Sequence, residues 1–206
     1  MAAVAKERLK GPRARLFVAL DLPEETREGL VAWGERELMD PALRPVAPAS
    51  LHITLAFLGH RPEEEIEAIA ATVRESAAPA PWVELRDPEQ RPPRGRARLY
   101  ALPAISPGAE ALQAGLRQRL VEGGFYEAEK RSFWPHVTVA RVRSEARGSR
   151  RPAAVSKPPG PIPEELSRPR LAVRMALYRS VLLPSGAQYV PLAQVELPGG
   201  GSSEVI

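Results

Sequence analysis

The stretches LHITLAFLG at residues 51–59 and PHVTVARV at residues 135–142 both place a histidine two residues before a threonine within an apolar run. Side chains alternate between the two faces of a β-strand, so each stretch would present its histidine and threonine on one face and its apolar residues on the other. The chain has only three histidines and four threonines, and chance would give two such pairs in about one of a thousand sequences. The repeat therefore predicts two matched strands that serve one site.

Composition limits the kinds of protein to which these strands can belong. With 206 residues the chain is long enough for one large domain or two small lobes. It has no cysteine, which excludes disulfides, thiolate metal sites and thiol nucleophiles. The formal net charge is +4, and all but four of the 29 basic residues are arginine. A partner rich in phosphate is compatible with this charge but is not shown by it.

Alternating strand and helix signals indicate an α+β protein. Short apolar runs predict strands, and proline or serine followed by acidic or small residues marks the start of each of three helices. Each α+β half would then contribute one copy of the motif. In chain order we expect a strand at 15–22, a helix from Pro23, the first motif strand ending at Gly59, a helix with Pro62 in its first turn, two strands within 81–103, a helix between Ser106 and Gly123, the second motif strand, and two strands within 171–197 that turn at 184–186.

The predicted domain is single and bilobal over residues 15–197, with flexible tails at 1–14 and 198–206. Within it, the segment 144–170 is too rich in proline, arginine and serine for a core element. We expect this segment to form a surface excursion with one helical turn at PEEL. The N-terminal residues lack the apolar core of a signal peptide, and no apolar run reaches about 18 residues, so we expect a cytoplasmic protein.

The paired motif suits one chemistry better than the alternatives. Imidazole titrates near neutral pH, so one histidine can take a proton from water while the other gives a proton to a leaving oxygen. Threonine hydroxyls, together with a cation, can hold the oxygens of a phosphodiester. These roles predict in-line phosphoryl transfer without a metal ion or a cofactor.

Other kinds of site fit the residues less well. Two histidines without cysteine or a carboxylate cluster seldom form a closed metal site. The third histidine, His60, is expected to be structural or solvated. A serine nucleophile is not supported, because the chain has no Gly-x-Ser-x-Gly motif and a second matched histidine would be unexplained.

Together with RLFVALDLP at 15–23 and LYRSVLLPSGAQYVPL at 177–192, the motif stretches resemble the two-histidine (2H) phosphoesterase superfamily. Within it they are most similar to the bacterial and archaeal RNA 2′,3′-cyclic phosphodiesterases, also known as 2′-5′ RNA ligases. The resemblance implies a bilobal fold whose two pseudo-symmetric lobes have antiparallel sheets facing a central cleft and helices outside. It implies metal-independent hydrolysis of a terminal 2′,3′-cyclic phosphate on RNA to a 2′-phosphate. The implied catalytic residues are His52, Thr54, His136 and Thr138.

The resemblance also implies roles for residues outside this quartet. Arg141, three residues after the second threonine, would bind substrate, which requires a bulge or the end of the strand because a regular strand turns that position to the other face. Phe17 would stack on a base, although a core phenylalanine explains the position equally well. Family members often have an arginine where this chain has Ala56. The resemblance favours His136 as base and His52 as acid, which the residues alone do not decide.

Three other functions remain open from the sequence. The same residues could join RNA ends through a 2′-5′ linkage, act on a cyclic phosphate of a small nucleotide or an ADP-ribose derivative, or belong to a non-catalytic RNA-binding module. For the hydrolase we expect RNA ends with a 2′,3′-cyclic phosphate as substrate, those of tRNA fragments among them. We also expect a monomer with no membrane partner.

Overall fold

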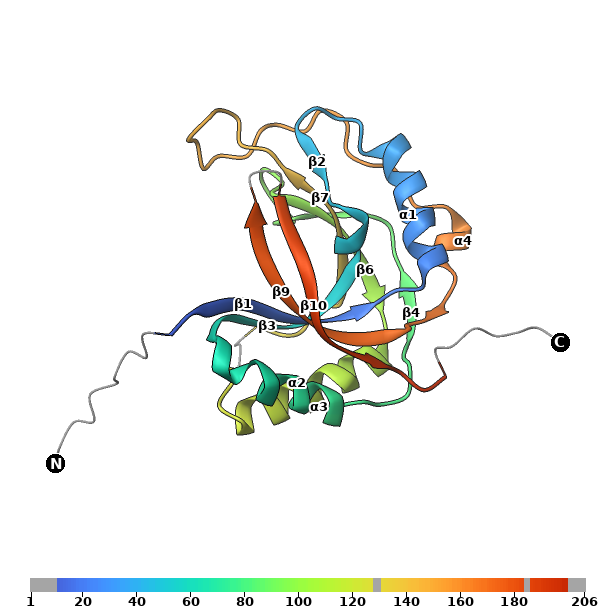
Figure 1. Ribbon diagram of the computed structural model, residues 1–206. Helices are drawn as coiled ribbons and strands as arrows, with labels where there is room; N and C mark the ends of the chain where they lie inside the picture. Colours follow the sequence, from blue (N-terminus) through green and yellow to red (C-terminus); the bar gives the residue numbers. More distant parts are fainter. Residues whose placement is uncertain (1–10, 128–130, 184–185, 200–206) are drawn as a thin grey trace.

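A computed structural model describes residues 11–127, 131–183 and 186–199, and it shows the alternation of strands and helices that the sequence predicts (Figure 1). None of the helices in these ranges is long and apolar enough to span a bilayer. The elements in chain order are β1 (Arg13–Asp21), α1 (Glu24–Glu37), β2 (Leu43–Pro45), the 3-10 helix η1 (Pro48–Ser50), β3 (His52–Pro62), the 3-10 helix η2 (Glu63–Glu65), α2 (Ile66–Glu75), β4 (Trp82–Leu85), β5 (Glu89–Arg91), β6 (Leu99–Ile105), α3 (Pro107–Glu122), β7 (His136–Val142), α4 (Glu164–Ser167), β8 (Arg170–Leu171), β9 (Arg174–Leu183) and β10 (Gly186–Glu196).

The strands form one antiparallel sheet that consists of two halves. Its main path runs β10-β9-β1-β3-β7-β6-β4-β8, and β2 and β5 pair with β7 and β6 outside this path. The two motif strands, β3 and β7, lie at the middle and share a single paired position, Ile53 with Val137. Outward from this junction, each half continues with three more strands along the main path, and β2 and β5 extend the half that contains β7. The predicted α+β class with two related lobes is therefore confirmed.

Helices cover the outer faces of the sheet, and the core lies between the helices and the sheet. Apolar strand residues such as Leu20 and Ile53 are completely buried (0 % exposed). Helix α2 packs on β9, β10 and α3, and α1 packs against α4, so the helices form two separate groups (Figure 1). Helix α3 begins where the sequence predicts, because the Ser106 hydroxyl accepts a hydrogen bond from the Ala109 amide at 3.2 Å.

The strands differ from the predicted ones in their bounds and in their number, since the short strands β2, β5 and β8 are not predicted from the sequence. β3 does not end at Gly59 but continues to Pro62, because its last residues pair with the start of β1. β1 accordingly begins at Arg13, inside the expected N-terminal tail. The region 81–103 contains a third short strand, β5, which pairs with β6. Residues 1–10 and 200–206 of the expected tails, and most of the expected turn after β9, lie outside the described residues.

The segment after β7, for which the sequence predicts a surface excursion, contains the short helix α4. The Asp40 carboxylate accepts hydrogen bonds from the amides of Ser156 and Lys157 and from the Ser156 hydroxyl, at 2.7–2.8 Å. Hydrogen bonds to this carboxylate, first that from the Lys157 amide, lower the pKa of Asp40 to about 2. The Trp33 indole donates to the Pro161 carbonyl at 3.0 Å. The excursion is therefore fixed to α1 and to the loop that follows it.

Candidate active site

The two His-x-Thr motifs meet at the junction between the halves of the sheet. Ile53 and Val137 are paired across antiparallel strands, so continuing this register by one residue in each direction sets the histidine of each motif across from the threonine of the other. Ile53 and Val137 themselves are buried in the core, so the polar neighbours face the opposite side. The side chains that line the cleft from this junction are His52, Thr54, His136 and Thr138.

A β-bulge in β7 turns Arg141 toward the cleft. The pairing of β7 with β6 skips Val139, since Thr138 and Ala140 pair with consecutive residues of β6. The extra residue reverses the alternation of faces, so Arg141 lines the cleft together with Thr138. The bulge that a substrate-binding role for Arg141 requires is therefore present.

β3 carries the matching bulge directly after its own threonine. Its pairing with β1 skips Leu55, and Phe57 then reaches the cleft at the position that corresponds to Arg141 in β7. Ala56, which stands where an arginine was expected, is 3 % exposed. The positive charge of the site must therefore come from other positions.

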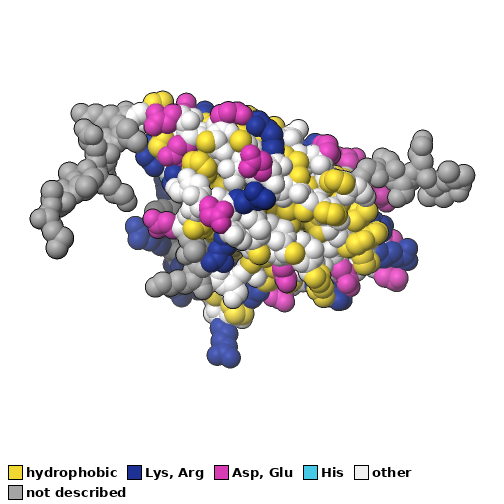
Figure 2. All heavy atoms as spheres, turned by 90° about the horizontal axis from the view of Figure 1, so that it is seen from below, with side chains coloured by type: hydrophobic (Ala, Val, Ile, Leu, Met, Phe, Trp, Pro, Cys, Tyr) yellow, Lys and Arg dark blue, Asp and Glu magenta, His cyan; other side chains and the backbone are white. Residues whose placement is uncertain are grey.

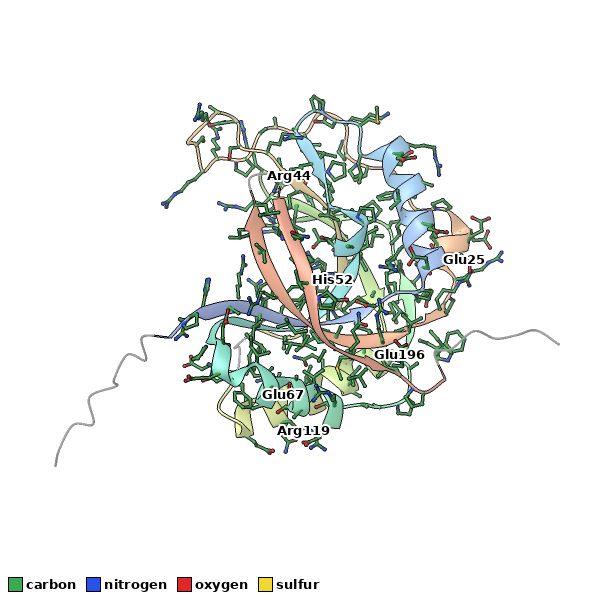
Figure 3. All side chains as sticks on the ribbon, viewed as in Figure 1. Glu25, Arg44, His52, Glu67, Arg119 and Glu196 are labelled. Carbon is green, nitrogen blue, oxygen red and sulfur yellow. The ribbon has the colours of Figure 1, made fainter. Side chains whose placement is uncertain are left out.

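The cleft has a volume of about 900 Å³, and its lining carries positive charge. No Asp or Glu of the described residues lines it. A concave surface with charge of one sign concentrates ligands of the opposite sign. Figure 3 shows how widely the lining is spread: Arg44 comes from β2 near one end of the molecule, and His52 from β3 near its centre. The lining arginines are Arg15, Arg44, Arg117, Arg131 and Arg141.

His52 is packed among aromatic side chains. Its ring stacks on Phe17 and Tyr178, with centroids 5.2 and 6.2 Å apart, and meets the Tyr189 ring at a steep angle at 5.5 Å. Burial lowers the pKa of His52 to about 4, and the negative charge of Asp21 only partly opposes this. His52 is therefore neutral at neutral pH before an anion enters the cleft.

A buried ionic network supports the aromatic rings that surround His52. The Asp21 carboxylate, 5 % exposed, accepts hydrogen bonds from Arg174 Nε at 2.7 Å and from the Tyr178 hydroxyl at 2.8 Å. Burial and the nearby carboxylate raise the pKa of Tyr178, so its hydroxyl remains a donor. Because Tyr178 stacks on His52, the network fixes the imidazole while the Asp21 charge favours its protonated form.

His136 is oriented through its Nδ1 atom, which lies 2.7 Å from the Trp134 carbonyl oxygen. A carbonyl can only accept, so Nδ1 carries a proton and Nε2 of the neutral ring keeps a free lone pair. Burial lowers the pKa of His136, the hydrogen bond to Trp134 opposes this, and the charges of Arg91 and Arg141 lower the pKa further. A neutral imidazole with one available lone pair suits a proton acceptor.

Trp134 and Arg91 form a stack behind His136. The indole and imidazole centroids are 4.0 Å apart with the planes 17° from parallel, and the Arg91 guanidinium carbon lies 3.8 Å from the Trp134 ring centroid. Glu89 pairs with Arg91 at 3.0 Å. The stack restricts the His136 ring and brings a positive charge close to it.

The two phenylalanines that line the cleft from β1 and β3 differ in how much of each side chain is exposed. Phe17 lines the cleft but is only 1 % exposed, because it stacks on His52 and on Phe57. Phe57 is 46 % exposed, and the Arg15 guanidinium carbon lies 5.5 Å from its ring centroid. A base-stacking role for Phe17 therefore stays a prediction, and the exposed ring of the two belongs to Phe57.

Some residues of the site escape prediction from the sequence. Arg44 lies on β2, which is too short to predict, and pairs in register with Arg141. Trp134 lies two residues before His136, so the sequence alone could have indicated it as an aromatic neighbour of the second motif. Arg91 is far from the motif in the sequence, and only the fold brings it beside Trp134. His60 is exposed and lies outside the cleft lining. In the described ranges, no three His, Cys, Asp or Glu side chains gather where they could hold a metal ion.

Comparisons with known proteins connect this geometry with a family. Residues 23–173 match the family model described as the 2′-5′ RNA ligase superfamily. The chain is 34 % identical over 192 residues to the RNA 2′,3′-cyclic phosphodiesterase of Thermus thermophilus, covering 90 % of this chain and 91 % of the relative. It is 35 % identical over 134 residues to the Escherichia coli protein of that name, covering 64 % of this chain and 74 % of the relative.

Solved structures show the same similarity. The crystal structure of TT0787 from Thermus thermophilus superposes with a TM-score of 0.72 at 33 % identity, over 91 % of this chain and all of that one. Escherichia coli LigT complexed with 3′-AMP superposes with a TM-score of 0.71 at 28 % identity, over 90 % of this chain and 99 % of that one.

Replacing Arg91 tests how the stack controls His136. We expect Arg91→Gln to raise the pKa of His136, because it removes a positive charge that disfavours the imidazolium while leaving the Trp134 carbonyl in place. The measurement is an NMR titration of the His136 ring. Arg86→Gln, at an exposed arginine paired with Glu84, is the matched control and should not move this pKa. An unchanged or lowered pKa in Arg91→Gln would contradict the assigned electrostatics.

Proposed function

This chain belongs to the 2′-5′ RNA ligase superfamily, and we propose that it is an RNA 2′,3′-cyclic phosphodiesterase that opens the cyclic phosphate at an RNA end to a 2′-phosphate. The observation that carries the proposal is the meeting of two His-x-Thr motifs at one junction. Among the described residues, the charged side chains that line the cleft above them are all arginines. This lining fits a phosphodiester anion.

The proposed reaction adds water across one phosphorus–oxygen bond. Nε2 of His136 takes a proton from the attacking water, whose oxygen bonds to phosphorus opposite the 3′ oxygen. The bond from phosphorus to that oxygen breaks, and His52 gives it a proton, which leaves a 2′-phosphate and a 3′-hydroxyl. Thr54, Thr138 and Arg141 hold the non-bridging oxygens, whose charge grows in the transition state.

The proposed function extends to the protonation of His52, to the oligomeric state and to the kind of RNA that is bound. The substrate anion bound beside His52 raises its pKa, because negative charge stabilises the imidazolium, so the acid form develops as substrate binds. The whole quartet comes from one chain, so a monomer is sufficient. RNA fragments with cyclic ends, those of tRNA among them, are the proposed substrates.

Incubation with an oligonucleotide that ends in a 2′,3′-cyclic phosphate tests the function. We expect conversion to a 2′-phosphate in the presence of EDTA, because the proposed chemistry uses side chains only. The double variant His52→Ala/His136→Ala should fold normally and lose at least about 10⁴-fold in rate, since each acid or base contributes about 10²–10⁴-fold. His60→Ala is the control and should keep full activity. A 3′-phosphate product, or activity in the double variant, would refute this mechanism.

The pH dependence provides an independent check. Both histidine pKa values are lowered in the free protein, that of His52 to about 4, so kcat/KM should peak between about 4 and the ordinary value of 6.5. Bound substrate raises the pKa of His52, so the peak of kcat should lie at higher pH than that of kcat/KM. Steady-state rates across pH measure both, and a kcat/KM that peaks above neutral pH would contradict the burial effect.

A further inference from the structure

Seven exposed arginines gather beside the cleft, on the β5–β6 loop and on the start of the excursion after β7. Two of them, Arg96 and Arg151, form ion pairs with Glu145. Within the described ranges, the other five form no hydrogen bond or ion pair with an acidic side chain. We call this surface the arginine-rich edge, and it consists of Arg94, Arg96, Arg98, Arg143, Arg147, Arg150 and Arg151.

Hydrogen bonds give the arginine-rich edge a defined form. Ser144 and Pro152 form an isolated β-bridge, and the Glu145 amide donates to the Arg151 carbonyl at 3.0 Å. Arg96 joins the two parts of the edge, because its guanidinium donates to Glu145 at 3.1 Å and to the Pro152 carbonyl at 2.8 Å. The arginines are therefore presented on an ordered surface.

The edge is continuous with the positive lining of the cleft. Arg141 and Arg143 are two residues apart, and the Arg143 amide donates to the Ala42 carbonyl at 2.8 Å, next to β2 and its Arg44. In Figure 1 the excursion extends beyond β2 and β7, and in Figure 3 the labelled Arg44 lies beneath it. From Thr138 to Arg143 the chain advances five residues, or roughly 17 Å in extended conformation.

The opposite face lacks this concentration of one charge. Figure 2 shows the side that carries α2 and α3, where acidic and basic side chains are interspersed with apolar ones. Arg74 on α2 pairs with Glu67 at 2.9 Å, as expected for such a surface. The positive surface next to the cleft is therefore a local feature of the molecule.

We propose that the arginine-rich edge binds the phosphate backbone of the RNA that precedes the cyclic phosphate, so that the protein selects RNA chains over free nucleotides. This inference rests on the proposed function. A single nucleotide held at the histidines does not span roughly 17 Å, whereas an RNA of several nucleotides does. Arginine pairs well with phosphate, and contacts to the backbone bind RNA without reading its sequence.

Binding and kinetics of one double variant test the proposal. Arg147→Gln/Arg150→Gln removes two edge arginines with no acidic partner in the described ranges. Arg74→Gln/Arg119→Gln removes the same charge from the α2–α3 face, outside the cleft lining. The substrates are a dinucleotide and a single-stranded RNA of about 20 nucleotides, both ending in a 2′,3′-cyclic phosphate. The same RNA with a 3′-hydroxyl end is used to measure Kd by fluorescence anisotropy, because this measurement does not depend on turnover.

We expect Arg147→Gln/Arg150→Gln to raise Kd and KM for the long RNA roughly tenfold and to reduce the slope of log Kd against log salt by about 1.4, or 0.7 for each lost phosphate contact. Turnover of the dinucleotide and kcat should not change. The control variant should match the wild type in every measurement. Equal losses in both variants, or no loss in either, would overturn the proposal while the function stands. If the wild type hydrolyses neither substrate, the proposed function fails, and anisotropy still decides whether the edge binds RNA.

Discussion

One pairing between two strands determines the rest of the site. Ile53 and Val137 are the single paired position at which the halves of the sheet meet, and both side chains are buried in the core. This one contact brings the two motifs together, so that the histidine and threonine of each line the same cleft. Slipping the register by one residue would turn the polar positions into the core and the apolar ones into the cleft. Core packing therefore secures the geometry of the four motif side chains.

The two halves are alike at the junction but differ in what surrounds each imidazole. His52 rests on Phe17 and Tyr178, with the buried Asp21 behind them. His136 is held by the Trp134 carbonyl and lies near Arg91. A negative charge on one side and a positive charge on the other push the two pKa values in opposite directions, on top of the burial that lowers both. Two like motifs therefore place their imidazoles in different surroundings, and the proposed role of His52 as acid depends in addition on the substrate anion, which raises the pKa of His52 as it binds.

How much of this can be predicted from the sequence depends on how local the cause is. The quartet is predictable because alternation along a strand is local, and the start of α3 is predictable because Ser106 caps it. The bulge at Val139 could be inferred only as a condition for Arg141 to face the cleft. The continuation of β3 beyond Gly59 depends on pairing with β1. The place of Arg91 beside Trp134 likewise depends on strand pairing, which no local pattern encodes.

In the proposed mechanism, His136 removes the proton from water and His52 protonates the leaving oxygen. A nucleoside phosphodiester whose leaving group is 4-nitrophenolate tests it most directly, because this group departs without a proton. We expect His52→Ala to hydrolyse this substrate at nearly the wild-type rate, and we expect His136→Ala to remain slow. Rescue of His136→Ala instead would reverse the two roles. Rescue of neither variant would contradict acid–base catalysis and would leave both histidines as stabilisers of charge.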